Sequence, residues 1–408
     1  MTRLLRPFRR QPVLATAQLL VGLELLAVAL ISDIGSLARL VGVVLMMMVT
    51  GVLLVLTLDE RAVRRGSAAL IGGVLGFSFG AGLGPVWLAT SGITVVALVS
   101  LAALVAGVVL LAAAAWILIR AVPRWWRLAA LPVAFVILQF VLIPLAGAAY
   151  GTHPPQTPLE AEQPANAQLV AFETPDGVTL RAWYTPASNG ATIILLPGSG
   201  GAKGSTLAHA SVLQEHGYGT LALDSRGTGD SGGTGNAWGW HGVADVDGAL
   251  TWLLAQTGVD PGRVGILGLS MGGEVAITAA AADQRLGAVV AEGVSARVPA
   301  DMDYLPGGIT GTIQRWDGEL MWAVAELMTS ATPPPPLREA VAAAARMPVL
   351  LIVGGAEDES AAAPILQRAA PSMELWELPD TPHIQSLAEH PAAWERLVVD
   401  FLDDALAA

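Results

Sequence analysis

Gly268-Leu269-Ser270-Met271-Gly272 follows a strand-like run at 263–267 and opens an alanine-rich helix. A serine on so tight a strand-to-helix turn projects its hydroxyl away from the backbone, and glycines two positions before and after it leave room for the bend. The motif therefore predicts that Ser270 is a nucleophile on an elbow shaped by Gly268 and Gly272. Because the chain contains 45 glycines, the prediction also needs a base, an acid and an oxyanion site in the right order.

Around this elbow, short apolar runs alternate with helical stretches, which is typical of a mainly parallel sheet covered by helices on both faces. Asp176-Gly177 separates the first two runs and predicts a hairpin turn between them. The sequence thus indicates an α/β fold with an eight-stranded sheet. The expected strands are 169–173, 179–184, 192–196, 219–223, 264–267, 286–291, 349–353 and 374–378.

A histidine is the expected base, because its pKa near neutrality lets it take and return a proton. Of the six histidines, His383 is placed best, since it follows the last predicted strand at the edge where loops converge. The orienting acid should follow the strand at 349–353. We select Asp358 and leave Glu357 and Glu359 open, because a one-residue bulge would exchange them.

The glycine-rich turn Pro197-Gly198-Ser199-Gly200-Gly201 follows another predicted strand and can aim backbone N–H groups at a developing oxyanion. The expected donors are the amide of Met271, directly after the nucleophile, and the amide of Ser199. A nucleotide site fits poorly, because Lys203 stands where G-x-G-x-x-G requires its third glycine. The order Ser270, Asp358, His383 is that of α/β-hydrolases and differs from the chymotrypsin and subtilisin orders.

Two further motifs accompany the elbow. The run Asp224-Ser225-Arg226-Gly227-Thr228-Gly229-Asp230-Ser231-Gly232 is similar to the turn D-x-R-G-x-G-x-S-x-G, and Asp260-Pro261-Gly262-Arg263 precedes the elbow strand. With these motifs, the chain from about Leu169 to its end resembles α/β-hydrolases of the groups related to monoacylglycerol lipases, dienelactone hydrolases and serine aminopeptidases. We expect Asp224 and Arg226 to brace their turn rather than to catalyse.

The resemblance implies a serine hydrolase that cleaves an ester, or else a thioester or amide, through an acyl-enzyme and a Ser-His-Asp triad. It implies no metal and no organic cofactor. The expected partner is a small-molecule or lipid-like acyl substrate. The alternatives are a peptidase or an acyltransferase on the same fold, or an inactive binding or sensing module attached to a membrane domain.

The N-terminal part of the chain is unusually apolar, and the mean hydropathy of the whole chain is +0.58. Runs at 13–31, 37–58, 67–89, 93–119 and 128–150 each reach the roughly 20 apolar residues that a bilayer crossing requires. We predict an all-α bundle of about five transmembrane helices. A cleaved signal peptide would account for the first run at most.

The arginines between these runs predict the orientation of the chain in a membrane. They cluster before the first run and in alternate loops: Arg3, Arg6, Arg9, Arg10, Arg61, Arg64, Arg65, Arg120, Arg124 and Arg127. Since cytoplasmic loops carry the excess of Lys and Arg, the N-terminus is expected to be cytoplasmic. Five crossings then make the chain a multi-pass plasma-membrane protein with an extracytoplasmic hydrolase domain.

Charge and composition divide the chain into a membrane domain at 1–150, a Pro-rich linker at 151–168 and a hydrolase domain at 169–408. The net charge is +7 over residues 1–150 and −19 over residues 151–408. An acidic globule is a poor ligand for nucleic acid, so we expect none. The absence of cysteine excludes disulfides and a thiol nucleophile. An irregular interval at about 298–336 is expected to be a cap over the strand ends.

Four glycines recur every fourth residue in the third apolar run: Gly72, Gly76, Gly80 and Gly84. This spacing leaves one helix face without side chains and favours close helix packing. The face is expected to pack within the bundle, or else to form the seam of a homodimer.

Overall fold

The structure is a computed structural model that describes residues 11–156, 161–305 and 307–407. The arginines at positions 3, 6, 9 and 10, as well as residues 157–160 of the expected linker, lie outside the described residues. The described chain divides into two compact units. The first contains the residues up to Pro155 together with Gly308–Ser330, and the second contains the remainder.

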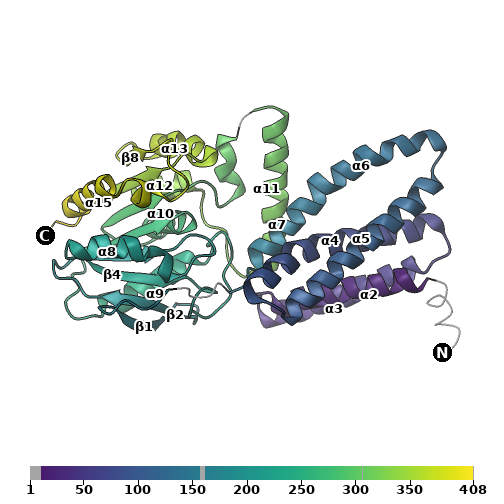
Figure 1. Ribbon diagram of the computed structural model, residues 1–408, viewed down its shortest axis with the longest axis horizontal. Helices are drawn as coiled ribbons and strands as arrows, with labels where there is room; N and C mark the ends of the chain where they lie inside the picture. Colours follow the sequence, from purple (N-terminus) through teal and green to yellow (C-terminus); the bar gives the residue numbers. More distant parts are fainter. Residues whose placement is uncertain (1–10, 157–160, 306, 408) are drawn as a thin grey trace. The chain divides into compact units, whose positions relative to one another are not determined.

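The first unit contains the five apolar runs as helices (Figure 1). All five are long and apolar enough to cross a membrane, as expected. The first four are α2 (Pro12–Ile31), α3 (Ser36–Thr57), α4 (Ala62–Ser91) and α5 (Val95–Ala121). The fifth, at Arg124–Thr152, consists of η1 (Arg124–Ala129), α6 (Ala130–Ile137), the π-helical turn η2 (Leu138–Leu142) and α7 (Ile143–Thr152).

The glycine face of α4 is occupied within the chain. A Cβ atom on Gly72 would lie 2.2 Å from the side chain of Gln18 in α2, and one on Gly80 would lie 2.5 Å from the backbone of Leu104 in α5. Equivalent atoms on Gly76 and Gly84 would meet Val21 and Leu101. All four glycines are buried, so this face packs inside the bundle, which is the first of the two expected arrangements.

The second unit contains one eight-stranded sheet in the order β1-β2-β4-β3-β5-β6-β7-β8. β1 pairs antiparallel with β2, β2 pairs antiparallel with β4, and the remaining pairs are parallel. The strands are β1 (Gln168–Glu173), β2 (Thr179–Thr185), β3 (Thr192–Leu196), β4 (Gly219–Asp224), β5 (Val264–Leu269), β6 (Ala288–Glu292), β7 (Val349–Val353) and β8 (Glu374–Glu377). Gly177, with φ +81°, makes the expected turn between β1 and β2.

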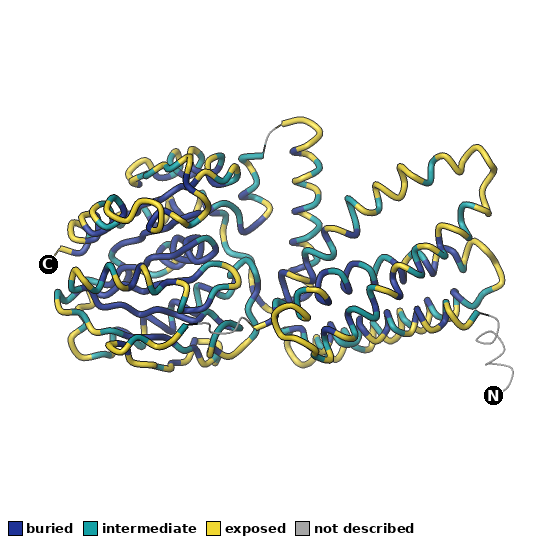
Figure 2. The backbone as a smooth tube through the Cα atoms, in the orientation of Figure 1, coloured by how far each residue is buried: buried dark blue, intermediate teal, exposed yellow. Residues whose placement is uncertain are grey.

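Helices cover both faces of this sheet, and the alternation along β3 shows how. Ile194 and Leu196 belong to a core that includes side chains of α9 (Gly242–Leu254), α10 (Met271–Ala282), α12 (Leu337–Ala344) and α13 (Glu357–Ala369). Ile193 and Leu195 face the opposite core, which includes α8 (Leu207–Glu215) and α15 (Pro391–Ala405). The central strands are accordingly buried along their whole length (Figure 2). This is the α/β-hydrolase fold predicted from the sequence.

The remaining short helices are η3 (Lys203–Thr206), η4 (Pro299–Tyr304) and α14 (Ser386–Glu389). The long helix α11 (Ile309–Met328) departs from expectation. It lies within the interval 298–336 that we expected to cap the strand ends, but it belongs to the first unit, where it packs against α7 and η2. Its amphipathic sequence required an apolar partner without specifying which one.

Candidate active site

The elbow is present between β5 and α10, with Ser270 at φ 54° and ψ −123°. Such a conformation costs free energy in a non-glycine residue, and it persists only where packing of the surrounding structure enforces it. Gly268 and Gly272 make it possible: a Cβ on Gly268 would lie 2.0 Å from the Gly272 carbonyl oxygen, and one on Gly272 would lie 2.5 Å from two carbonyl oxygens at the end of β3. The close approach of these backbones positions the serine.

The imidazole of His383 faces the serine, with Nε2 at 2.9 Å from Ser270 Oγ. His383 follows β8 in a tight turn, in which Ile384 has φ 50°. Ser270 and Ile384 are the two non-glycine residues with positive φ in the described chain. Gly293, at the end of β6, leaves room for the ring, because a Cβ there would lie 2.9 Å from His383 Cε1.

Glu359, and not the selected Asp358, contacts the histidine. Its Oε1 accepts a hydrogen bond from His383 Nδ1, and its Oε2 accepts one from the Gly354 N–H at 2.8 Å. Glu359 is 1% exposed, whereas Glu357 is exposed and Asp358 is half-buried. The selection of Asp358 was wrong because α13 starts at Glu357, so each residue of this turn points in a different direction.

The electrostatics of this group suit a base that must carry positive charge during a reaction. The hydrogen bond that His383 donates to Glu359 is the main cause that raises the pKa of His383, and burial opposes it. Further contributions come from the charges of Asp358 and Glu292. In the arrangement that these contacts define, Nδ1–H donates to Glu359 and Nε2 is left to accept the Ser270 proton.

The turn after β3 lies beside the nucleophile. A Cβ on Gly198 would be 3.3 Å from the Ser270 Cβ atom. Within the part of the chain that the structure describes, no hydrogen-bond acceptor is found for the amides of Ser199 and Met271. Met271 is the first residue of α10, where backbone N–H groups have no partner inside the helix. The N–H groups of both predicted donors are therefore free to donate a hydrogen bond to a ligand.

Glu292, the last residue of β6, was not singled out from the sequence. Its carbonyl oxygen accepts a hydrogen bond from the Ser270 N–H at 2.7 Å, and its Oε1 accepts one from the Ser386 N–H at 3.0 Å. Glu292 is 3% exposed, and burial raises its pKa. It thus links the nucleophile to the loop after His383. The sequence feature that could have identified Glu292 is its position as a carboxylate at the end of an otherwise apolar strand.

Glu274, one helical turn beyond the nucleophile, is also buried. Its Oε1 accepts a hydrogen bond from the Ser295 N–H at 3.0 Å, and burial raises its pKa to about 7. The fully buried Arg297 lies nearby and donates to the Gly239 carbonyl at 2.6 Å and to Thr278 Oγ1 at 2.6 Å. These contacts hold the loop after β6 and give Glu274 a structural role.

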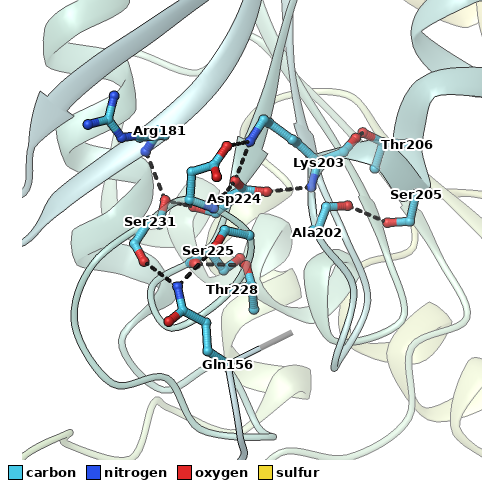
Figure 3. A network of polar contacts seen from close by, with 12 residues as sticks. Gln156, Arg181, Ala202, Lys203, Ser205, Thr206, Asp224, Ser225, Thr228 and Ser231 are labelled. Carbon is cyan, nitrogen blue, oxygen red and sulfur yellow. Dashed lines mark hydrogen bonds and ion pairs between the residues drawn. The ribbon is translucent and has the colours of Figure 1, made fainter. Parts of the chain in front are cut away.

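Asp224 and Arg226 brace their turn, as expected. Asp224 is fully buried and accepts hydrogen bonds from Lys203 Nζ at 2.5 Å and from the Lys203 N–H at 2.7 Å (Figure 3). Lys203 Nζ also reaches Asp230 at 2.8 Å. Arg226 pairs with Asp176 and Asp245. Lys203, which stands where a nucleotide-binding loop would require glycine, therefore anchors the segment after the glycine-rich turn to the end of β4.

Among the described residues, no group of three or more histidine or acidic side chains is arranged to hold a metal ion. The polar groups around Ser270 are instead a hydroxyl, an imidazole and a carboxylate in one hydrogen-bonded chain. This arrangement can activate a serine for attack on an acyl carbon.

Comparisons with known proteins support a hydrolase. The model of the X-Pro dipeptidyl-peptidase (S15) family matches residues 176–397, which is more than half of the chain. The polyketide transferase grgF of Penicillium sp is 36% identical over 133 residues, or 30% of this chain and 43% of that protein. A thiohydrolase of Eupenicillium brefeldianum is 35% identical over 146 residues, or 35% and 47% respectively. The chain thus spans less than half the length of these two relatives.

Among solved structures, an esterase from Pyrococcus furiosus matches with a TM-score of 0.49 and 21% identity. The match covers 62% of this chain and 97% of the esterase. The structure of grgF matches with a TM-score of 0.46 and 22% identity, over 59% of this chain and 99% of that chain.

Proposed function

The chain belongs to the X-Pro dipeptidyl-peptidase (S15) family, and from this premise we propose that it is a membrane-anchored serine hydrolase that cleaves a carboxylic ester through an acyl-enzyme. The observation that carries the proposal is the hydrogen-bonded chain from Ser270 through His383 to Glu359. The S15 family and the hydrolase fold support enzymatic activity. The five apolar helices support membrane anchoring.

In the proposed reaction, Ser270 Oγ attacks the acyl carbon while His383 Nε2 takes its proton. The buried carboxylate of Glu359 holds the imidazole tautomer and stabilises the imidazolium that forms. The amides of Met271 and Ser199 donate to the oxyanion. His383 then protonates the leaving group, and a water molecule activated by the same histidine releases the acyl group from Ser270.

The first prediction is that Ser270→Ala abolishes covalent labelling by a fluorophosphonate probe and lowers the turnover of short p-nitrophenyl esters by on the order of 10⁴-fold or more. Both readouts depend on the serine oxygen. The matched control is Ser211→Ala, which changes an exposed serine on α8 and should keep both activities. Turnover by Ser270→Ala equal to that of the unaltered chain would rule out the proposal.

A peptidase is the second candidate, because the matching family is described as X-Pro dipeptidyl-peptidases. Thioester cleavage and acyl transfer are further candidates, because two relatives are named thiohydrolase and polyketide transferase. A panel of p-nitrophenyl esters, acyl thioesters and Xaa-Pro dipeptide anilides, each assayed with and without an added alcohol acceptor, separates these reactions. Preference for esters of increasing acyl length would support a lipid-like substrate.

A further inference from the structure

Helix α11 has two apolar faces. One contains small and aromatic residues that are buried: Gly311, Gly318, Trp322 and Ala325. The opposite face carries large apolar side chains at helical spacing, which we call the apolar stripe: Ile309, Ile313, Trp316, Leu320 and Leu327. Within the stripe, Ile309 is 82% exposed, Trp316 is 53% exposed and Leu327 is 79% exposed. A helix in water normally has one apolar face, so the stripe calls for a second apolar partner.

Contacts along α11 attach it to the fifth apolar helix. Near its C-terminal end, Met328 Sδ lies 3.9 Å from Thr152 Oγ1. Further along, Gln139 Nε2 donates to Asp317 Oδ2 at 2.5 Å. The rings of Phe140 and Trp316 meet edge to face at 6.5 Å. These contacts, all within the first unit, place α11 beside the second half of the fifth helix.

The stripe continues into the exposed apolar surface of that same helix. Three residues of the stripe, Ile309, Ile313 and Trp316, line a groove of about 350 Å³ together with Phe140, Gly308 and Thr312. The fifth helix also exposes apolar side chains on either side of Phe140, namely Phe135, Val136, Leu138 and Ile143. If this helix crosses a bilayer, the same lipid chains that cover it reach the groove and the stripe.

We propose that α11, although its sequence lies between two strands of the hydrolase sheet, is a lipid-embedded helix whose apolar stripe contacts the acyl chains of the bilayer. The proposal rests on the membrane insertion proposed above. Glu319 and Glu326 are exposed beside the stripe and face the aqueous or headgroup side, as in helices that lie in a membrane interface with one apolar face inserted.

The chain contains no cysteine, so single cysteines in the full-length protein can be labelled with bimane without background. The protein is placed in nanodiscs of phosphatidylcholine and phosphatidylglycerol, in which both leaflets face solvent. Ile309→Cys and Leu327→Cys report the stripe, and Glu319→Cys and Glu326→Cys are the matched polar controls on the same helix. Quenching by doxyl-labelled lipid is compared with quenching by iodide.

We expect a lipid-to-iodide quenching ratio that is several-fold higher at positions 309 and 327 than at 319 and 326. Equal ratios at all four positions overturn the proposal. Resistance of 309 and 327 to both quenchers also overturns it, because a second copy or another protein surface would then cover the stripe. Each variant must retain fluorophosphonate labelling, which shows that the hydrolase unit is folded.

Phe135→Cys, on the exposed face of the fifth helix, separates this proposal from the one on which it rests. If bimane at 135 is quenched by lipid while bimane at 309 and 327 is quenched by iodide, the chain spans the membrane and only the assignment of α11 fails. If bimane at 135 is quenched by iodide alone, membrane insertion itself fails.

Discussion

Three consecutive acids occupy the first turn of α13, and only the third reaches the imidazole of His383. Neighbouring residues in a helix are rotated by about 100° from one another. Glu357 and Asp358 therefore point away from the contact that Glu359 makes. Because Glu359 is buried and also bonded to the Gly354 N–H, its carboxylate is held in one position.

The second prediction compares Glu359→Gln with Asp358→Asn. The glutamine should lower kcat by on the order of 10³- to 10⁴-fold, by analogy with triad acids changed to amides. It also removes the negative charge of the carboxylate, whose hydrogen bond with His383 raises the pKa of the imidazole. Since the neutral imidazole is the active base, a lower pKa moves the acidic limb of the kcat/KM profile to lower pH.

Asp358→Asn is the matched control, because it changes an acid one residue away that contributes to the pKa of His383 by its charge alone. It should retain most of kcat, with a smaller shift of the acidic limb in the same direction. A larger loss of kcat in Asp358→Asn than in Glu359→Gln would return the role of triad acid to Asp358.

The third prediction concerns Glu292, which receives the Ser386 N–H. Glu292→Ala leaves this buried donor without its acceptor, at a cost of about 1–3 kcal/mol, and loosens the loop after His383. We expect a lower Tm and a lower kcat with little change in KM. Glu377→Ala, at the exposed end of β8, is the control. Unchanged Tm and kcat in Glu292→Ala would show that this link has no positioning role.

At this scale, the sequence predicted Ser270 and His383 because their chemistry and chain order are distinctive. It could not choose among adjacent acids, since that choice depends on where a helix begins. Nor did it identify Glu292, because an acid at the end of a strand acquires its role only when a loop nearly a hundred residues away lies against it.

At the scale of elements, the elbow depends on backbones that approach more closely than side chains allow. Gly272 packs against carbonyl oxygens at the end of β3, and Gly268 packs against the backbone of Gly272 itself. Ser270 therefore lies where the backbones of β3, β5 and α10 pack together. This close packing holds the serine at its positive φ.

The fourth prediction is that Gly272→Ala abolishes fluorophosphonate labelling and lowers Tm, because its Cβ would lie 2.5 Å from two backbone oxygens that have little room to move. Gly262→Ala, in the loop before β5, is the control, since its Cβ would meet its nearest neighbour at an ordinary 3.5 Å. Labelling of Gly272→Ala at the rate of Gly262→Ala would contradict this account of the elbow.

The strands could be predicted to within two residues at each end, because short apolar runs such as those of β3, β5 and β7 have few alternatives in a parallel sheet. α11 could be recognised as irregular but not assigned to a partner. Its composition, with tryptophan and methionine among acids, suits a cap over a sheet as well as a helix beside a membrane span.

At the scale of the whole molecule, the proposed topology is that of an N-terminus in the cytoplasm and a hydrolase unit outside. The fifth prediction tests it with single cysteines and an impermeant maleimide on intact cells. Ser91→Cys, at the end of α4, and Asp404→Cys, in α15, should be labelled directly. Glu60→Cys, between α3 and α4, should be labelled only after permeabilisation, because the arginine-rich loops face the cytoplasm.

A cell-surface reaction at Glu60→Cys, with Asp404→Cys protected, would reverse the orientation. Direct labelling of both positions would contradict a sealed crossing between them. These outcomes also bear on the substrate, because an extracytoplasmic hydrolase and a cytoplasmic one would meet different pools of esters.

The path of the polypeptide through α11 has a practical consequence for dissecting the enzyme. The chain leaves the hydrolase unit after Gly307 and re-enters it at Ala331, having contributed a helix to the other unit in between. A protease cut near residue 156 would therefore nick the protein without freeing a soluble catalytic fragment. To produce a soluble catalytic fragment, residues 308–330 would also have to be replaced by a short loop. A gene truncated only at the linker would encode a hydrolase that keeps this apolar helix without its partner helices, and that protein would tend to aggregate.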